Sequence, residues 1–588
     1  MRGEGGWRDV VADDIGPGRT RNRNTTDSGR LTAGTPIDKT EGRSDGHGGR
    51  GGEAPVEVGG VRELSIQDPG RRSGIGRHPR SPAVGVVLVP GPVIRSCAGP
   101  VPAPGYCPEV RGRGDRWSWG AVGISLCVAV VALTTHEMWR DEWQAWLLAD
   151  GSASLSELLS NVRDEGHSPL WHILLFGLSR VGPVELMRLL VAAVAVASTA
   201  IVTWCGPFRT WQKPVFALGY FSAFEYLAVS RPYGLTALFA FTYAALAWSS
   251  TRSHTAWRAV LLVLLALTSV YGAMLALVLG AAAVLERWPE RRRSALVPAG
   301  AAVAGVALSL LLARPRATTT GFFSTDPLLN PFLGLDPDRV DLRQLVRALV
   351  PIPPLRHDGW WDNSVVDSPN GIVVALFAGI AVGIVALGLR RSPVSLAMWI
   401  TGVVGFLLFG YVMYSGSIYH YGHLYLLAVA AIWFASSRVG EAVDQRMVIA
   451  LLGVQALGGV AAIALDATGP FSNGERVAAV VQPGELVVVD PDWFGATIAG
   501  ESGSGVFMVT SEERRSFVRW NEARECEERS APLCLDLQNV LGRAERAGAD
   551  VLVLPLDVRL PHTEPWQLFE VFSGAATDED FAVYRHTG

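Results

Sequence analysis

The chain of 588 residues is almost without lysine, since only Lys39 and Lys213 occur among 51 basic residues. Its six cysteines form no Cys-x-x-Cys pair and no metal-ligand cluster, which excludes the common zinc and dithiol motifs. The glycine-rich stretch Gly500–Gly505 lacks the lysine of a phosphate-binding loop, so no nucleotide-binding motif is present. The N-terminal region has no compact secretory signal, and the chain shows no internal repeat.

What is abundant is apolar sequence. Hydrophobic residues make up 49% of the chain, and the mean hydropathy is +0.25. Long apolar runs recur from Trp117 to Leu465. This composition excludes an ordinary soluble protein and predicts a polytopic membrane protein. The net charge of -4 decides little, because the charges are segregated by region.

Residues 1–115 differ from the rest of the chain. They are rich in Gly, Arg, Pro, Asp and Ser, with no periodic apolar face. Such a composition buries too little apolar surface to offset the entropy lost on ordering. Two interpretations stay open: a disordered cytoplasmic tail, or translated upstream sequence from a misplaced start codon.

The apolar runs predict about eleven membrane-spanning helices within a transmembrane domain of residues 116–468. The expected spans are 117–135, 184–205, 214–229, 234–250, 256–270, 272–287, 295–313, 370–389, 394–413, 420–437 and 447–466. The apolar run Pro169–Leu178 is shorter than the ~20 residues that a span needs, so we expect it to lie along the membrane surface.

Loop charges set the expected orientation. With the N-terminus inside, every cytoplasmic loop carries Arg or Lys, as the positive-inside rule requires. These loops are Arg209–Lys213, Thr251–Arg258, Glu286–Arg293, Arg390–Arg391 and Arg438–Arg446. The protein is thus expected in the cytoplasmic membrane, with its C-terminal domain outside.

The segment that follows the first span carries the strongest chemical signal. In Met138-Trp139-Arg140-Asp141-Glu142-Trp143, two adjacent carboxylates stand among tryptophans at the expected membrane boundary. Tryptophans alone are typical of an interfacial belt, but carboxylates there are costly unless a cation or a reaction uses them. The same outer face is expected to hold 164–171, 230–233, Tyr271 and 414–423.

Three passages resemble the GT-C superfamily of membrane glycosyltransferases. They are Arg140-Asp141-Glu142-Trp143-Gln144-Ala145-Trp146, Glu165-Gly166-His167-Ser168-Pro169-Leu170-Trp171 and Ser230-Arg231-Pro232-Tyr233-Gly234-Leu235. Within the superfamily, the chain is similar to family 39-like proteins, related to protein mannosyltransferases and lipid A aminoarabinose transferases. The resemblance implies a polyprenyl-phosphate-linked sugar donor, an acceptor bound at the outer face, and juxtamembrane helices in the first outer loop. One departure is Tyr419, which precedes His420 where related sequences often have arginine.

The resemblance assigns the catalytic role to the acidic pair. Asp141 is expected to be the general base and Glu142 its supporting neighbour, unless both are solvated loop acids. Arg231 is expected to bind the donor phosphate through its bidentate fork, unless its charge only extends to the interface. The further expected substrate-binding residues are Tyr233, His167, Glu165, His420 and His423.

Cofactor and metal requirements stay open. His420 and His423 lie three residues apart, on one helical face, but no third ligand accompanies them. No metal site is therefore assigned, and no cofactor is certain, although a divalent cation is not excluded by the sequence.

Residues 469–588 are expected to form a separate, small α/β domain outside the membrane. Short apolar runs at 486–489, 506–509 and 551–554 predict strands, and Leu537–Ala547 predicts a helix. Cys526 and Cys534 are close in sequence and in an expected oxidising compartment, which favours a disulfide over two free thiols.

The predicted function is therefore transfer of a sugar from a polyprenyl-phosphate donor to a glycan, lipid or protein acceptor. Membrane lipid is an expected partner and nucleic acid is not. The alternatives are a multi-spanning transporter and a non-catalytic membrane scaffold; a transporter is expected to show repeats and broken helices near the midplane. The sugar, the acceptor and the oligomeric state are beyond what the sequence specifies.

Overall fold

The computed structural model describes residues 115–247, 252–287, 292–316, 341–437, 443–521, 533–560 and 565–588. The predictions made for residues 1–114 lie outside this part of the chain. Residues 96–588 form one compact unit, so the helical region and the C-terminal fold can be described together.

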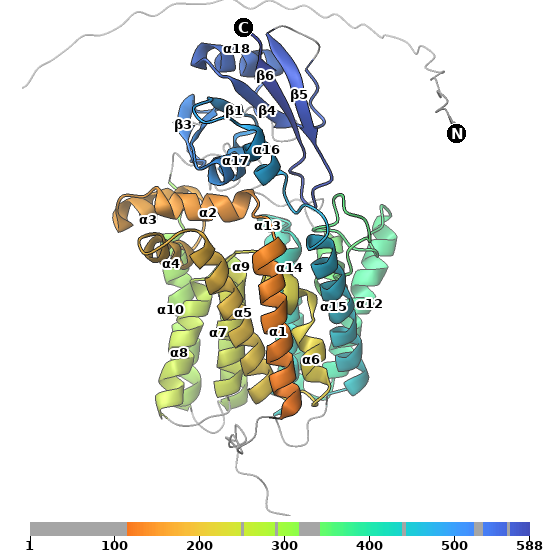
Figure 1. The fold of residues 1–588 in the computed structure, drawn as a ribbon. Coiled ribbons are helices and arrows are strands. Elements are labelled where there is room, and N and C mark those ends of the chain that lie inside the picture. The colour runs from red at the N-terminus through yellow and green to blue at the C-terminus, as the bar shows by residue number, and fades with distance from the viewer. Residues whose placement is uncertain are drawn as a thin grey trace, which may run out of the picture. The chain divides into compact units, whose positions relative to one another are not determined.

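A bundle of apolar helices forms the larger part of this unit (Figure 1). Among the described residues, seven helices are long and apolar enough to cross a membrane, which makes the chain a multi-pass membrane protein. They are α1 (Arg116–Thr135), α5 (Glu185–Cys205), α10 (Arg292–Leu312), α12 (Gly371–Leu389), α13 (Pro393–Val412), α14 (Ile418–Ser436) and α15 (Gln445–Asp466). The shorter helices α7 (Tyr233–Leu246), α8 (Arg252–Ala266) and α9 (Val270–Arg287) run beside them.

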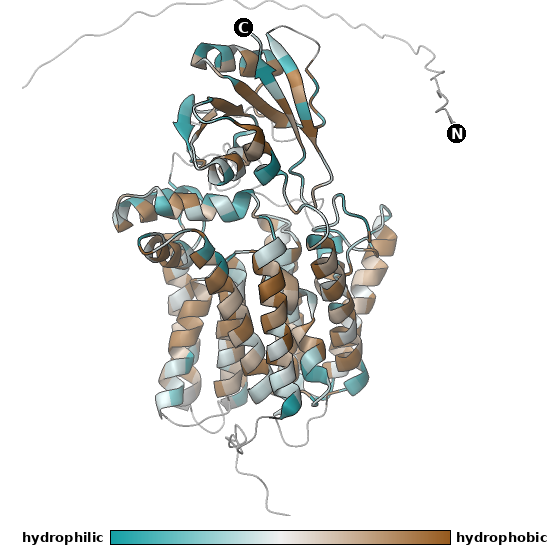
Figure 2. Ribbon diagram, in the orientation of Figure 1, coloured by the Kyte–Doolittle hydropathy of each residue, from teal (hydrophilic) through white to brown (hydrophobic). Residues whose placement is uncertain are grey.

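The bundle is organised around α14. Its apolar stretch is completely buried by the other helices, whereas only 28% of the apolar stretch is buried in α12 and in α10. Figure 2 shows the outer helices as predominantly hydrophobic along their length, with hydrophilic residues gathered near the ends. An apolar surface of this kind matches the hydrocarbon core of a bilayer.

One predicted span is interrupted. Residues 214–229 do not form a single helix: α6 covers Gln212–Ala217, the π-helical turn η1 covers Phe221–Glu225, and irregular backbone follows as far as α7. Gly459 of α15 lies directly against this break, since a Cβ there would come within 2.1 Å of the Leu218 carbonyl oxygen. At this break the backbones of Gly459 and Leu218 are in close contact. The apolar composition of residues 214–229 did not reveal this contact.

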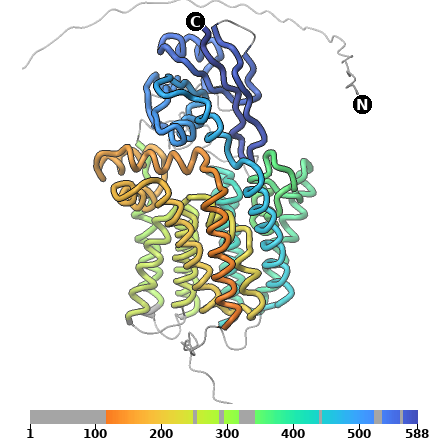
Figure 3. The backbone as a smooth tube through the Cα atoms, viewed as in Figure 1, coloured from red at the N-terminus to blue at the C-terminus, as the bar shows by residue number. Residues whose placement is uncertain are grey.

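Three short helices cross the end of the bundle on the side of the C-terminal fold. They are α2 (Arg140–Asp150), α3 (Leu155–Asp164) and α4 (Leu170–Ser179). Figure 3 shows the backbone turning from α1 into α2 at this end. The placement of the apolar run at 169–178 outside the set of spans is confirmed. Helix α11 (Leu342–Leu349) is a further short element.

The C-terminal fold contains a six-stranded sheet of order β3-β2-β1-β4-β6-β5. The strands are β1 (Val487–Val489), β2 (Val506–Met508), β3 (Glu513–Arg515), β4 (Val551–Pro555), β5 (Trp566–Phe572) and β6 (Phe581–His586). Strands β2, β1 and β4 are parallel, and the outer pairs are antiparallel. The helical elements are α16 (Gly474–Val480), η4 (Asp492–Phe494), α17 (Gly495–Ser502) and α18 (Leu537–Ala547).

Alternation along the parallel strands divides the core of this fold into two layers. Val487 and Val489 face the α16 and α17 side, whereas Val488 faces α18. Successive side chains of a strand point to opposite faces, so a continuous run of valines serves both layers. The strands predicted at 486–489, 506–509 and 551–554 and the helix predicted at Leu537–Ala547 are confirmed.

Candidate active site

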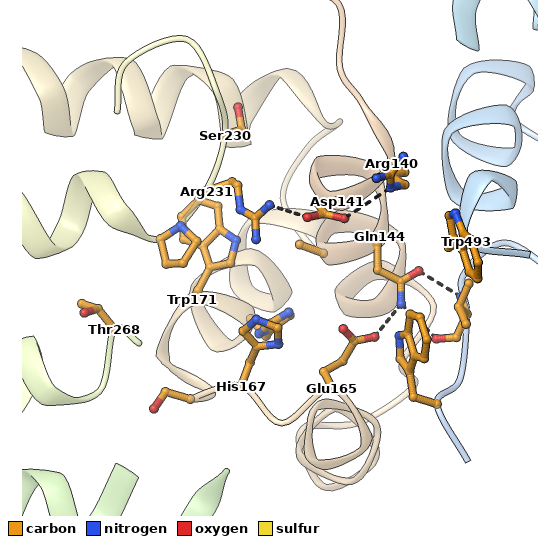
Figure 4. A pocket seen from close by; sticks show the side chains of 16 residues that line it. Arg140, Asp141, Gln144, Glu165, His167, Trp171, Ser230, Arg231, Thr268 and Trp493 are labelled. Carbon is orange, nitrogen blue, oxygen red and sulfur yellow. Dashed lines mark hydrogen bonds and ion pairs between the residues drawn. The ribbon is translucent and has the colours of Figure 1, made fainter. Parts of the chain in front are cut away.

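An open cavity lies between the juxtamembrane helices and the C-terminal fold (Figure 4). It has a volume of about 790 Å³, counted to include the solvent at its mouth. Its lining residues are Arg140, Asp141, Gln144, Ala145, Glu165, His167, Ser168, Trp171, His172, Ser230, Arg231, Pro232, Thr268, Trp493, Val518 and Trp520. All three passages that carry the family resemblance contribute to it.

The acidic pair belongs to the first turn of α2 and not to a loop. Carboxylates are favourable there, because the first backbone N–H groups of a helix lack partners and the helix dipole is positive at this end. The Glu142 carboxylate accepts a hydrogen bond from the Trp139 backbone N–H at 3.2 Å, which caps the helix. Since consecutive helix positions differ by about 100° in direction, Asp141 and Glu142 diverge.

Asp141 faces the cavity and is paired with Arg231. The Asp141 side chain remains 37% exposed, whereas that of Arg231 is only 11% exposed. The guanidinium lies over the Tyr419 ring at 4.4 Å and over the Tyr233 ring at 5.4 Å. Arg231 is thus held by an aromatic surround, with its charge directed at a partly open carboxylate. Figure 4 shows the two side chains meeting within the cavity.

Glu142 is turned into the protein interior, where its side chain is fully buried. Its carboxylate accepts the Ser230 backbone N–H at 2.5 Å and lies 3.3 Å from Nε2 of His136. Nδ1 of His136 lies 2.9 Å from a carboxylate oxygen of Asp466. Burial alone would lower the pKa of His136, but the Asp466 and Glu142 carboxylates raise it to about 10. Glu142 therefore belongs to a buried ion cluster and does not reach the cavity.

Glu165 and His167 line the cavity, and their expected role in substrate binding stays a prediction. Burial raises the pKa of the Glu165 carboxyl to about 8, even though Gln144 donates a hydrogen bond to it at 2.6 Å. Burial and the nearby charge of Arg231 lower the pKa of His167 to about 4. Near neutral pH both groups are therefore uncharged, and the main charges facing the cavity are those of arginine and Asp141.

The other expected binding residues lie behind the cavity wall. Tyr233 accepts a hydrogen bond from Arg231 at 3.4 Å and stacks on Tyr419. The His420 ring stacks on Tyr271 at 4.5 Å, and its Nδ1 accepts the Ser417 backbone N–H at 3.0 Å. These residues support Arg231 or cap α14, and none of them contributes to the cavity lining.

His423 is likewise remote from the cavity. Its Nδ1 lies 2.7 Å from the His420 carbonyl oxygen, and its buried Nε2 has no hydrogen-bond partner. Within the described ranges, no three or more His, Cys, Asp or Glu residues are grouped so that they could hold a metal ion. A divalent-cation requirement stays a prediction.

Sequence reasoning expected the C-terminal domain to bind the acceptor or to shield the site, but it named none of the residues that line the cavity. Trp493, Val518 and Trp520 form one wall of the cavity. Gln144 fixes this wall, because its amide donates to the Val518 carbonyl at 2.9 Å and accepts the Val518 N–H at 2.9 Å. The position of Gln144, one turn after Arg140, was the only available signal for its part in the site.

Only one of the two cysteines of the predicted disulfide lies within the described residues. Cys534 is disulfide-bonded, whereas Cys526 lies outside the described residues. Their pairing stays a prediction. Cys127 and Cys205, in α1 and α5, form no disulfide.

Comparisons with known proteins give a fold likeness. No protein-family model matches the chain, and neither does any curated protein. Among solved structures, it is similar to the crystal structure of ArnT from Cupriavidus metallidurans bound to undecaprenyl phosphate, with 11% sequence identity and a TM-score of 0.40. The match covers 80% of this chain and 98% of that chain. At this identity and score the likeness assigns no activity, so the function below rests on the site itself.

Proposed function

We propose that the chain is a membrane glycosyltransferase, which moves a sugar from a polyprenyl-phosphate donor to an acceptor hydroxyl. The observation that carries this proposal is the pairing of Asp141 with Arg231 in one open cavity at the end of an apolar bundle. A proton acceptor and a cation side by side are what glycosyl transfer from a lipid phosphate requires. The position at the bundle end suits a donor whose tail stays in the membrane.

Arg231 is assigned to the donor phosphate. Its fork of N–H donors matches phosphate oxygens bidentately, and the Tyr419 and Tyr233 rings hold the guanidinium plane in place. A bound phosphate competes with Asp141 for the same guanidinium. Donor binding therefore releases the Asp141 carboxylate from its ion pair and leaves it ready to accept a proton.

Asp141 is assigned as the general base. The acceptor O–H proton passes to its carboxylate as the acceptor oxygen bonds to the anomeric carbon of the sugar. The bond between that carbon and the phosphate oxygen breaks, and its electron pair leaves with the polyprenyl phosphate. Arg231 stabilises the phosphate charge that develops, so the two residues act on opposite sides of the reacting carbon.

Glu165 and His167 are assigned to binding, in uncharged form. A protonated Glu165 and a neutral His167 offer hydrogen bonds to sugar hydroxyls without competing with Arg231 for the phosphate. We further propose that the N-terminus is inside and that the C-terminal fold is outside the cytoplasmic membrane. This orientation places the cavity on the outer face and the arginine-rich loops on the inner face.

The test is direct. Membranes that contain the chain are incubated with polyprenyl-phosphate sugars radiolabelled in the sugar, in parallel with membranes that contain Asp141→Asn. Label in a new product with the unchanged chain, and donor left intact with Asp141→Asn, is the expected result. Equal label in both, or in neither across the panel of sugars, contradicts the proposal.

A transporter is the second candidate, and the interrupted segment between α6 and α7 favours it. Glu225 is buried at this interruption and accepts hydrogen bonds from Tyr220 at 3.0 Å and Trp361 at 3.1 Å. Broken helices with buried polar groups are typical of secondary transporters. The same labelled donors distinguish the two, since a transporter moves the intact lipid-linked sugar and forms no new sugar linkage.

A further inference from the structure

The wall of the cavity that the C-terminal fold contributes is aromatic and apolar. Trp493 comes from the turn after β1, and Val518 and Trp520 come from the extended segment that follows β3. In Figure 4, Trp493 stands beyond Gln144, on the far side of Asp141 from Arg231. Asp141 thus has Arg231 on one side, and Arg140 and the indoles on the other.

Successive side chains of residues 518–521 line different cavities, and this keeps charged side chains out of the wall. Val518 and Trp520 line the main cavity, whereas Arg519 and Asn521 line a separate, smaller cavity with Asp492 and other polar residues. Every charged residue that lines the main cavity comes instead from α2 and from the loops at the bundle end. The wall therefore offers ring faces and methyl groups, but no cation for an anionic ligand.

The wall is also firmly placed relative to Asp141. Gln144, on the same helix, binds the Val518 backbone through both the N–H and the oxygen of its side-chain amide. The Trp143 indole N–H donates to Glu501 at 2.9 Å, and its ring lies so close to Gly500 that a Cβ there would come within 2.1 Å of it. Both contacts fix the C-terminal fold on α2.

We propose that Trp493 and Trp520 form the acceptor subsite, and that the acceptor is a neutral saccharide chain. This inference rests on the proposed function. Indole faces stack on the C–H faces of sugar rings, and a saccharide held there presents a hydroxyl towards Asp141. Saccharides need no counter-charge, which agrees with an uncharged wall.

Two other acceptor classes fit this wall less well. An extended peptide adds to a protein by pairing with free backbone N–H and C=O groups. Here both backbone groups of Val518 are already bound to Gln144. An anionic lipid headgroup requires free cations on the aqueous side. The wall provides none, and the nearby Arg140 is already paired with Asp578 at 2.6 Å and with Asp141 at 4.0 Å.

The experiment measures binding separately from transfer. The full chain with Asp141→Asn is placed in lipid nanodiscs, so that bound acceptor is not consumed. Neutral arabino-, galacto-, manno- and gluco-oligosaccharides are the probes, and saturation-transfer NMR reports their affinity. We expect at least one to bind. Trp493→Leu and Trp520→Leu should each weaken it by about tenfold or more, the loss of one aromatic stacking contact.

The matched control is Trp211→Leu, since Trp211 is also partly exposed but lies next to α6, away from the cavity lining. It should bind the oligosaccharides like the parent, and Trp520→Phe should retain more affinity than Trp520→Leu. Thermal unfolding of each variant verifies the fold. Saccharide binding that depends on the two tryptophans supports the subsite, even in a chain that consumes no polyprenyl-phosphate sugar; that result would contradict the glycosyltransferase function alone.

Two results would overturn the subsite and leave the glycosyltransferase function standing. One is label transferred from the donor to a polypeptide. The other is unchanged transfer by Trp493→Leu and Trp520→Leu, together with no binding of any oligosaccharide in the panel.

Discussion

The Glu142 carboxylate accepts a hydrogen bond from the Ser230 backbone N–H at 2.5 Å. Each of these residues precedes or follows a residue of the reacting pair, since Asp141 comes before Glu142 and Arg231 comes after Ser230. The buried contact therefore sets the distance between the proposed base and the proposed phosphate ligand. One carboxylate of the acidic pair serves chemistry, and its neighbour serves geometry.

This division of roles predicts that substitution of Asp141 lowers activity, whereas substitution of Glu142 lowers stability. Asp141→Asn should fold and insert normally but lower transfer by about 10²–10⁴-fold, the usual contribution of a general base. Glu142→Gln should lower thermal stability, because it removes the charge that faces His136 in a fully buried site. Initial rates and unfolding midpoints of the purified variants measure both effects.

Asp150→Asn is the matched control, since Asp150 ends the same helix and is exposed. It should retain both activity and stability. A stable but inactive Glu142→Gln, combined with an active Asp141→Asn, would exchange the two roles.

Arg231 should govern affinity for the donor as well as turnover. Arg231→Ala should raise the donor KM and lower kcat, because it removes the cation that binds the phosphate and stabilises it as it departs. Arg231→Lys should recover only part of the loss, since lysine keeps the charge but not the bidentate fork. Steady-state kinetics with varied donor test this. Arg180→Ala, at an exposed arginine near α4, serves as control, and full activity of Arg231→Ala would remove Arg231 from the site.

His136 should make stability depend on pH. The two carboxylates raise its pKa in the folded chain to about 10, from 6.5 for an unperturbed histidine. The stabilisation is therefore complete below about pH 6.5 and is lost as the pH rises towards 10. His136→Gln should lower stability by about 3–5 kcal/mol near pH 6, because two buried carboxylates lose their cation.

Thermal unfolding between pH 6 and pH 10 measures this dependence. The difference between the parent and His136→Gln should shrink steadily as the pH rises. The exposed His357 provides the control His357→Gln, which should follow the parent throughout. A difference that stays constant with pH would show that His136 is not the charged partner.

Glu165 should act in the same direction at lower pH. Burial raises its pKa in the folded chain to about 8, above the usual value of 4.5. A buried carboxyl of this kind favours folding fully below about pH 4.5, and this contribution disappears as the pH rises through 8. Glu165→Gln keeps the uncharged shape, so it should unfold at a higher temperature than the parent at pH 9 and at a similar temperature at pH 4. Equal midpoints at pH 9 would contradict the shift.

The orientation predicts which cysteines an impermeant maleimide reaches. Glu545→Cys, on the exposed face of α18, should be labelled in intact spheroplasts. Thr210→Cys, in the loop between α5 and α6, should be labelled only after lysis. The parent chain measures the background from its own cysteines. The reverse pattern would invert the membrane orientation and place the cavity inside.

Much of the fold could be predicted because its causes are local. A span requires only a long apolar run, and α18 was found at its full extent because Leu537–Ala547 has a helical apolar period. The break in 214–229 could not be predicted, since it depends on the backbone of Gly459, more than 200 residues away, meeting that of Leu218. Strands β6 and β5 were missed for a similar reason, because β6 is defined by its pairing with β4, and the edge strand β5 by its pairing with β6.

The site was predictable only where one passage contains all the information. Asp141 and Arg231 stand in passages whose residue types indicate their chemistry. Trp493 and Trp520 stand in no motif, and their place in the cavity follows from how the C-terminal fold rests on α2. The different burial of Asp141 and Glu142 could be recognised only once both were known to belong to a helix, since direction around the helix axis decides which carboxylate is buried.

Gln144 binds only the backbone N–H and C=O of Val518, and this kind of contact has an evolutionary consequence. A backbone contact is indifferent to which side chain occupies position 518 or its neighbour Trp520. Mutations can therefore change the side chains of this cavity wall while the C-terminal fold keeps its position on the helical bundle. Selection is free to alter what enters from the aqueous side without disturbing the residues that handle the lipid phosphate.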